Sequence, residues 1–248
     1  MTTVLPLQKF NKGNYFRAYA LRNQEQLIDP FLGIDHAWMS APTFGPHPHA
    51  GFSAVSYVFQ DSSTAIENRD SIGNHNLIQP GGLHWAAAGK GIVHEEIPAE
   101  AGKTVHSLQI FIALPGELRN SAPFTLTLEP HEVPVVSRPG AKVRVVSGAF
   151  GATVSPLKPP TEVTLLDISL EDGTELEVPL QAGQRAVVMP ILGSLTVNGQ
   201  AHELADLKVP LIQSESGKNS FGLHAHQGGA QVMVFAAAPL QPGHPFQR

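Results

Sequence analysis

Short apolar stretches rich in β-branched and aromatic residues recur along the whole chain, and polar or glycine-containing turns separate them. This composition is typical of strands, because such side chains pack well on a pleated surface. The predicted strands cover residues 15–21, 52–60, 104–114, 142–147, 163–170 and 185–189. Turns are predicted at 60–63, 80–82, 171–173, 192–194 and 198–199, where the residues tolerate tight or left-handed backbone. No long stretch keeps a 3.6-residue apolar period, so the pattern indicates an all-β protein of sandwich or barrel type.

The two halves of the chain share a faint strand, turn, strand pattern, seen at residues 58–66 and 189–197. Aligning Ile66 on Val197 gives an offset of 131 residues, close to half of the 248-residue chain. This offset suggests two stacked copies of one β fold, with the junction in the proline-containing stretch 129–139. A chance likeness is the alternative. We therefore expect two domains, residues 1–130 and 131–248.

Composition and charge exclude several classes of protein. The chain has 16 Lys and Arg against 21 Asp and Glu, a net charge of −5, and no cluster of basic residues that would follow a nucleic-acid backbone. It has no cysteine, which rules out disulfides, thiolate metal sites and a cysteine nucleophile. The longest apolar runs, 110–114 and 232–238, are too short to span a bilayer, and no stretch of signal-peptide character is present. We expect a cytoplasmic protein that binds neither nucleic acid nor membrane.

Two histidine motifs carry the candidate chemistry. His47 and His49 flank Pro48, and His94 opens the run His94-Glu95-Glu96. Side chains at i and i+2 of a strand point to the same side, so His47 pairs with His49 and His94 with Glu96, while Glu95 points away. If both strands line one barrel, three imidazoles and one carboxylate converge and suit iron, manganese, nickel, copper or zinc. The alternative is that these are scattered surface histidines in a chain that has 12 of them.

The sequence resembles the pirins, a family of bicupins, in a series of ordered motifs. These are DPFLGIDH at 29–36, HPHAGF at 47–52, PGGLHW at 80–85, AGKGIVHEE at 88–96 and LQIFIALP at 108–115. The second half resembles the family only in its general pattern. The resemblance implies two tandem cupin, jelly-roll-like β-barrels. It also implies one non-haem iron, Fe²⁺, in the N-terminal barrel, with ligands at the positions of His47, His49, His94 and Glu96.

The resemblance implies two classes of function. Some pirins show quercetin 2,3-dioxygenase activity, whereas others are binding partners that regulate transcription factors or metabolic enzymes. Two positions depart from the family pattern, because Ala50 and Ser53 stand where an Arg and a Glu are usual. Position 53 corresponds to the carboxylate ligand of many other cupins, so a carboxylate from Glu96 fits its absence. The missing Arg at position 50 changes the charge near the site.

Five other histidines are weaker candidates. His106 could orient a metal ligand or be an ordinary strand-end histidine, and His84 or its neighbour Trp85 could line the mouth of a pocket. His36 is expected to make hydrogen bonds rather than touch a metal. His224 and His226 form a second His-x-His motif, but the 131-residue offset places Val178 and Leu180 where the first ligand pair would be. We therefore expect no metal in the second barrel.

The first functional hypothesis is an iron-dependent dioxygenase that opens the ring of a flavonol or a similar aromatic with O₂. The metal would acidify and orient a substrate hydroxyl, and Glu96 would take its proton. The alternative is a metal-dependent binding protein that acts through protein contacts without turnover.

Overall fold

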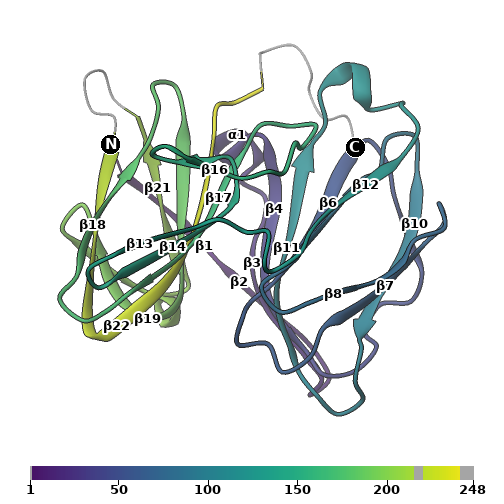
Figure 1. The fold of residues 1–248 in the computed structure, drawn as a ribbon, viewed down its shortest axis with the longest axis horizontal. Helices are drawn as coiled ribbons and strands as arrows, with labels where there is room; N and C mark the ends of the chain where they lie inside the picture. Colours follow the sequence, from purple (N-terminus) through teal and green to yellow (C-terminus); the bar gives the residue numbers. More distant parts are fainter. Residues whose placement is uncertain (1, 215–219, 241–248) are drawn as a thin grey trace.

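The computed structural model describes residues 2–214 and 220–240, and nearly all of its regular structure is β-strand. Helical segments within these described ranges are limited to α1 (Glu25–Ile28) and two 3₁₀ turns, Gly116–Leu118 and Leu204–Asp206. Two β-assemblies lie side by side, one mainly from the first half of the chain and one mainly from the second (Figure 1). The prediction of an all-β protein is therefore confirmed. None of the helices in the described part of the chain has the length and apolar character needed to cross a membrane.

The first half folds into two sheets that face each other. The larger has the strand order β12 (Phe124–Leu128), β9 (Leu83–Ala87), β6 (Phe52–Val58), β11 (Val105–Ala113), β4 (Phe31–Met39), β3 (Phe16–Leu21), β2 (Gln8–Lys12). The smaller has the order β5 (His47–His49), β10 (Ile92–Pro98), β7 (Ile66–Asp70), β8 (His75–Ile78). Every pairing in both sheets is antiparallel. Several pairings, such as those of β11 with β4 and β6, bring together residues that are far apart in the sequence.

The second half forms one nine-stranded sheet and a small ribbon. The path of the sheet is β1 (Thr2–Pro6), β21 (Lys208–Gln213), β19 (Arg185–Val197), β22 (Ser220–Ala237), β17 (Thr164–Leu170), β14 (Ala141–Ser147), β13 (Val135–Arg138). Off this path, β18 (Glu175–Pro179) pairs with β22 and β20 (Gln200–Glu203) pairs with β19. The ribbon joins β15 (Ala149–Phe150) to β16 (Thr153–Val154).

The first strand of the chain belongs to the sheet of the second half. β1 pairs antiparallel with β21, from Thr2 opposite Ile212 to Pro6 opposite Lys208. Figure 1 accordingly shows the N-terminus beside the second assembly. The expected boundary between residues 130 and 131 falls in the link from β12 to β13. The two-domain division stays a proposal, and β1 has to be assigned to the second unit.

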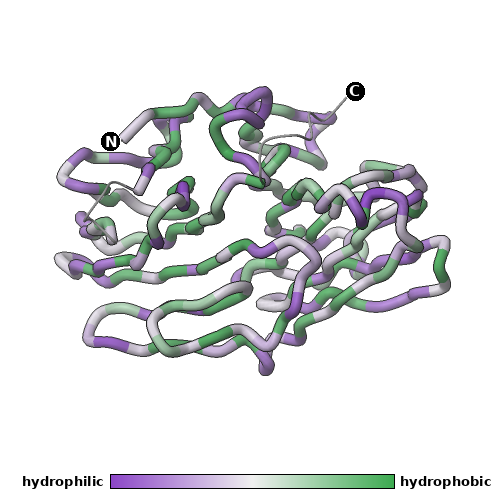
Figure 2. The backbone as a smooth tube through the Cα atoms, turned by 90° about the horizontal axis from the view of Figure 1, so that it is seen from above, coloured by the Kyte–Doolittle hydropathy of each residue, from purple (hydrophilic) through white to green (hydrophobic). Residues whose placement is uncertain are grey.

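One apolar core joins the two halves. Val55, Trp85 and Ile110 of the larger first sheet belong to the same buried cluster as Met189 and Phe235 of the second half, and we call this cluster the shared core. A second cluster lies within the second half alone. Hydrophobic and hydrophilic residues alternate along many strands in Figure 2, as expected where only one face of a strand enters a core. The larger first sheet therefore packs one face on the second half and turns the other to its own interior.

Buried polar contacts reinforce this junction. The Tyr57 hydroxyl donates to Oδ2 of Asp167 over 2.7 Å, and Gln231 donates to the other oxygen over 2.8 Å. Arg144 donates to the backbone carbonyl of Gly81 over 2.8 Å. Because buried polar groups that lose a partner are costly, these contacts specify how the halves dock.

The structure corrects one predicted turn. Residues 192–194 lie inside the continuous strand β19, which bends through irregularities between Pro190 and Leu192 and between Gly193 and Ser194. Gly193 has φ +75°, a conformation that glycine adopts without the penalty of a side chain. The predicted turn at this position is therefore a bulge within a strand. The pattern at 189–197 is one strand, whereas residues 58–66 run from β6 through a turn into β7.

Candidate metal centre

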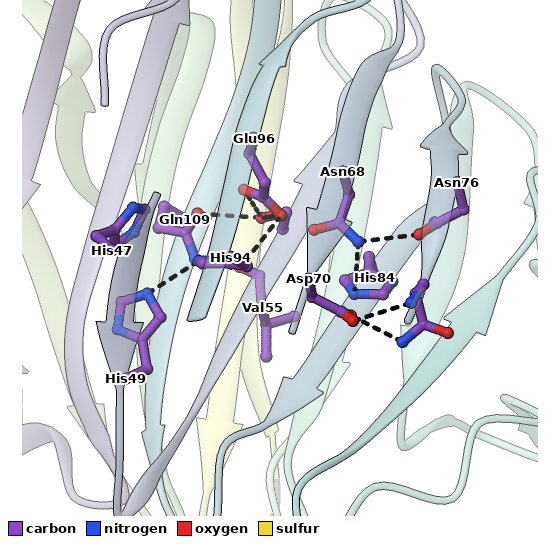
Figure 3. A network of polar contacts seen from close by, with 12 residues as sticks. His47, His49, Val55, Asn68, Asp70, Asn76, His84, His94, Glu96 and Gln109 are labelled. Carbon is purple, nitrogen blue, oxygen red and sulfur yellow. Dashed lines mark hydrogen bonds and ion pairs between the residues drawn. The ribbon is translucent and has the colours of Figure 1, made fainter. Parts of the chain in front are cut away.

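Two neighbouring strands bring three histidines together. β5 and β10 pair antiparallel, with His47 opposite His94 and His49 opposite Ile92. This pairing brings together His49 and His94, which are 45 residues apart in the sequence. The possible ligand atoms of His47, His49 and His94 lie within 4.8 Å of one another. Nε2 of His49 is 2.9 Å from Nε2 of His94. The convergence of the three imidazoles expected from strand parity is thus present (Figure 3).

Glu96 lies next to His94 and accepts a hydrogen bond from a serine, but it is not part of the group that the three histidines form. Its Oε1 is 4.0 Å from Nδ1 of His94. Ser56, from β6 of the opposite sheet, places its hydroxyl 2.8 Å and 2.7 Å from the two carboxylate oxygens. A hydroxyl has one proton and donates to one of these oxygens at a time. Glu95 lies opposite Arg69 on β7 and does not line the cavity that Glu96 lines.

Burial sets the protonation of the site. Burial, together with the neighbouring imidazoles, lowers the pKa of His49 to about 3 and that of His94 to about 4. Both rings are therefore neutral at ordinary pH, which is the form that binds metals. Burial raises the pKa of Glu96, against the opposing effects of the Ser56 hydrogen bond and the imidazoles of His84 and His47.

These residues fit a first-row transition metal. Three clustered imidazoles, of which those of His49 and His94 are neutral, and a nearby carboxylate match the donors that iron, nickel or zinc prefer. Nδ1 of His94 is buried without a hydrogen-bond partner, while its Nε2 points to His49. Metal-binding histidines usually pass their second ring proton to a carboxylate or a water. Glu96 is the nearest described carboxylate to this nitrogen.

His47 and His49 border a cavity of about 480 Å³ between the two sheets. Phenylalanines make up much of its lining, with Phe16 5.2 Å from Phe44 and Phe44 6.4 Å from His47, measured between ring centroids. Phe111 lies on the other side, 5.8 Å from the His49 ring. An apolar cavity with a few polar groups at fixed places is typical of a small-molecule site.

A row of polar side chains crosses the inner face of the larger first sheet. In consecutive strand pairings Asp35 lies opposite Gln109, Gln109 opposite Ser56, and Ser56 opposite His84. Ser56 is also 3.0 Å from Oε1 of Gln109. We call these four residues the inner polar row. Ser56 and Gln109 are not among the residues predicted from the sequence, although the parity of each strand places them opposite the apolar face that enters the shared core.

The inner polar row continues across the interior to the smaller sheet. Asn68 lies opposite Glu96 on β7 and donates to Asn76 over 2.9 Å, and its Nδ2 is 3.5 Å from Nε2 of His84 (Figure 3). His84 therefore faces the interior, and its neighbour Trp85 enters the shared core. This settles the side of the strand that the sequence left open.

His106 and His36 form a separate buried pair. Their Nε2 atoms are 2.7 Å apart, Nδ1 of His106 is 2.7 Å from Asp61, and the His106 ring stacks on Trp38 at 4.8 Å. On β11 the neighbour Ser107 lines the cavity, so His106 faces away from it. His106 does not orient a metal ligand, and the ordinary strand histidine was the correct alternative. His36 makes the expected hydrogen bond and is not among the three clustered histidines.

The second His-x-His motif points out of its sheet assembly. Leu223 and Ala225 on β22 enter the core of the second half, so the intervening His224 and the following His226 face outward. Their ring centroids are 4.1 Å apart, but no third ligand completes a group of three with them among the described residues.

The two departures from the family pattern lie away from the histidine cluster's inner face. Ser53 lies opposite Ile112, a member of the shared core, and is fully buried with an unpartnered hydroxyl. Its side chain therefore faces the second half, so a carboxylate at position 53 would not point toward the histidine cluster. Ala50 is exposed.

Comparison with known proteins identifies the family. The model of the family described as Pirin matches residues 9–112. A Pseudomonas aeruginosa protein named "Putative quercetin 2,3-dioxygenase" is 32% identical over 228 residues, which cover 86% of this chain and 76% of that protein. The crystal structure of a Geobacillus kaustophilus protein matches with a TM-score of 0.86 at 27% identity over 97% of each chain.

A solved structure with a stated metal has the same fold. The Escherichia coli bacterial pirin in complex with nickel(II) matches with a TM-score of 0.75 at 20% identity, over 97% of this chain and 100% of that one. The expected cupin fold is confirmed by these likenesses. The chain belongs to the pirin family.

Proposed function

We propose that this pirin is a metal-dependent dioxygenase that opens the ring of a flavonol or a similar hydroxylated aromatic with O₂. The proposal rests on the cluster of three imidazoles, two of which, His47 and His49, stand on the wall of a cavity of about 480 Å³ whose lining includes four phenylalanines. A planar apolar molecule fits such a cavity, and its oxygen substituents can reach the histidines. The name of the Pseudomonas relative supports the same substrate class.

His47, His49 and His94 would hold the metal, with Glu96 as the fourth ligand. We propose ferrous iron as the native metal, and manganese, nickel, copper or zinc suit the same donors. Bound iron would supply the redox chemistry toward O₂ that side chains cannot provide. The protein supplies three imidazoles in a fixed arrangement, because β5 and β10 hold them in one strand register.

Glu96 is also the base in this proposal. Its carboxylate lines the cavity, and the raised pKa makes it a better proton acceptor than an exposed glutamate. The hydroxyl proton of the substrate would pass to a Glu96 oxygen, and Ser56 would donate to the other oxygen. Both atoms of O₂ enter the products of a dioxygenase, and the aromatic substrate supplies the electrons. No outside reductant is required.

Oxygen uptake tests the proposal. Iron-loaded protein with quercetin should consume O₂ in proportion to protein, at a rate well above that of the same concentration of free iron. His94→Ala, treated in the same way, should fall to the rate of free iron. Equal rates for the protein and for free iron would reject the enzyme and leave the metal-dependent binding protein as the function.

A further inference from the structure

An ion pair stands in the apolar wall of the metal cavity. Arg22, which directly follows β3, binds Asp35 of β4 through its guanidinium group, and both residues line the cavity. Their neighbours in the wall are small, since Ala20 lies opposite Asp35 and Ala37 follows on the same face of β4. On its other side Asp35 lies opposite Gln109, so the ion pair stands at the end of the inner polar row and beside two alanines.

The backbone is built to accommodate this arginine. Gly33 lies two residues before Asp35 on the same face of β4, and a Cβ at position 33 would overlap the Arg22 guanidinium. The missing side chain lets Arg22 lie flat across the strand. The guanidinium carbon is then 4.8 Å from the centre of the Phe111 ring, a distance at which the cation and the ring attract each other. Asp35 and Phe111 therefore hold Arg22 from two sides.

Stability does not account for the pair. Burial raises the pKa of Asp35 to about 6 even though Arg22 opposes the change. Oδ1 of Asp35 is buried without a hydrogen-bond partner. An ion pair withdrawn from water often contributes no more than apolar residues of the same size would. Such an arrangement in a binding cavity suggests a role in recognising a ligand.

Phe111 connects the pair with the metal ligands. Its ring is 5.8 Å from the ring of His49 and 4.8 Å from the guanidinium of Arg22. A planar ring lying along Phe111 would have one edge near the histidines and the other near Arg22. The spare N–H groups of Arg22 can donate to a hydroxyl oxygen, and the Asp35 carboxylate can accept the hydroxyl proton.

We propose that Arg22 and Asp35 form a hydroxyl-binding subsite in the wall of the cavity beside Phe111. The ligand class is a planar polyphenol with its chelating oxygens at the histidines and a further hydroxyl on a remote ring. This inference rests on the proposed function for the aromatic ligand, and it adds the group that selects among aromatics. An aromatic without the remote hydroxyl would leave the ion pair facing an apolar edge.

Binding of two related probes tests the subsite. Quercetin and 3-hydroxyflavone share the chelating group, but only quercetin has hydroxyls on its other rings. Their dissociation constants are measured with metal-loaded protein in the absence of oxygen, so that turnover plays no part. We expect quercetin to bind about tenfold more tightly, the effect of one good hydrogen-bonded contact. Arg22→Met combined with Asp35→Leu should reduce the preference to about twofold or less, with 3-hydroxyflavone affinity nearly unchanged.

Two further variants serve as controls for the measured preference between the two probes. Arg69 and Glu67 form another Arg–carboxylate pair, with 2.6 Å between Nη2 and Oε1, outside the cavity. Arg69→Met combined with Glu67→Leu should retain the full preference. Asp35→Asn keeps the shape of the side chain and should give an intermediate preference if the double variant fails to fold. Equal binding of the two probes by the unchanged protein, an undiminished preference in the Arg22 and Asp35 variants, or no binding of either probe would overturn the inference.

The outcome separates this inference from the proposed function. A clear preference for quercetin without oxygen uptake would reject the dioxygenase and keep the subsite. Oxygen uptake that is equally fast with both probes, with equal affinities, would reject the subsite and keep the dioxygenase.

Discussion

Glu96 is a buried carboxylate whose two oxygens share the hydroxyl of a single residue, Ser56. Because Ser56 donates one proton, one Glu96 oxygen always has an unused acceptor site. That oxygen can take a proton or bind a cation, and the nearby groups that favour its charged form are imidazoles. The same residue can therefore serve the metal and the substrate.

Glu96→Gln separates these two roles. The amide keeps the shape but removes the charge and the basicity, so three histidines should still bind iron weakly, and turnover should fall by about 10²–10⁴-fold. Glu95→Gln is the matched control, since Glu95 does not line the cavity, and it should leave metal content and rate nearly unchanged. Iron content and flavonol-dependent oxygen uptake are measured for both. Equal losses in the two variants, or full activity in Glu96→Gln, would contradict the assignment.

His94→Ala tests the number of metal sites. The unchanged protein should bind one transition metal per chain, and removing one of three imidazoles should release most of it. His226→Ala is the comparison, because His226 faces outward from the second half and should not affect metal content. Metal analysis after dialysis gives the stoichiometry. Two metals per chain, one of them lost in His226→Ala, would show a second site.

At the residue scale, strand parity predicted which histidines converge. It also placed Glu96 rather than Glu95 on the side of the cavity, next to His94, while its role as a ligand stays a prediction. Ser56 could not be found in the same way, because its contact with Glu96 is between two sheets rather than between neighbouring strands. The orientation of one sheet over another depends on the whole fold. The Arg22–Asp35 pair joins the neighbouring strands β3 and β4 and was missed for another reason, since Gly33 explains the position of Arg22 only after the strands are paired.

In the larger first sheet, one face of a strand contacts the second half and the other face lines the interior of the first half. On β6, Tyr57 reaches Asp167 of the second half while its neighbour Ser56 holds Glu96 in the interior. The position of the site is thus tied to the junction of the halves. The predicted strands 15–21, 52–60, 104–114, 142–147 and 163–170 match observed strands to within two residues at each end. β1 escaped prediction because its partner, β21, is about 200 residues away.

A chain that ends at residue 129 should therefore be unstable, although it retains every proposed ligand. It would expose the larger sheet's side of the shared core and leave β1 without β21. Exposed apolar surface of this kind favours aggregation. Size-exclusion chromatography and thermal unfolding of the truncated chain, compared with the full chain, give the answer. A monomeric fragment that binds metal and melts cooperatively would contradict a shared core that matters to the fold.

At the scale of the whole molecule, buried histidines make stability depend on pH. The pKa of His49 is about 3 and that of His94 about 4 in the folded chain, against 6.5 for the free side chain. Between pH 6.5 and about 3 the unfolded chain binds protons that the folded chain does not, so these residues remove stability as the pH falls. Asp35, with its pKa raised to about 6, acts in the opposite direction over part of this range.

The metal-free protein should accordingly have a lower Tm at pH 5 than at pH 7. His49→Gln combined with His94→Gln should flatten this dependence, because glutamine does not titrate. His131→Gln, at an exposed position, is the control and should leave the slope unchanged. Thermal unfolding in chelator-treated samples across this pH range provides the measurement. A slope that is the same in the double variant would assign the pH dependence to other groups.

The two-assembly architecture followed from short strands, frequent turns and the family resemblance, whereas the docking of the halves did not. The shared core combines residues such as Trp85 and Phe235 that no local pattern relates. Apolar periodicity shows which face of a strand is buried. Both faces of the larger first sheet are covered, however, one by the second half and the other by the smaller sheet across the cavity.

The central claim is that His47, His49 and His94 form a single metal centre in the first half of the chain. Anomalous X-ray scattering from crystals of the iron-loaded protein, recorded at the iron edge, tests it most directly. We expect one strong anomalous peak per chain, surrounded by the three imidazoles at bonding distance and with Glu96 beside it. A peak at His224 and His226, or no peak between the three histidines under conditions where the protein contains iron, would contradict it.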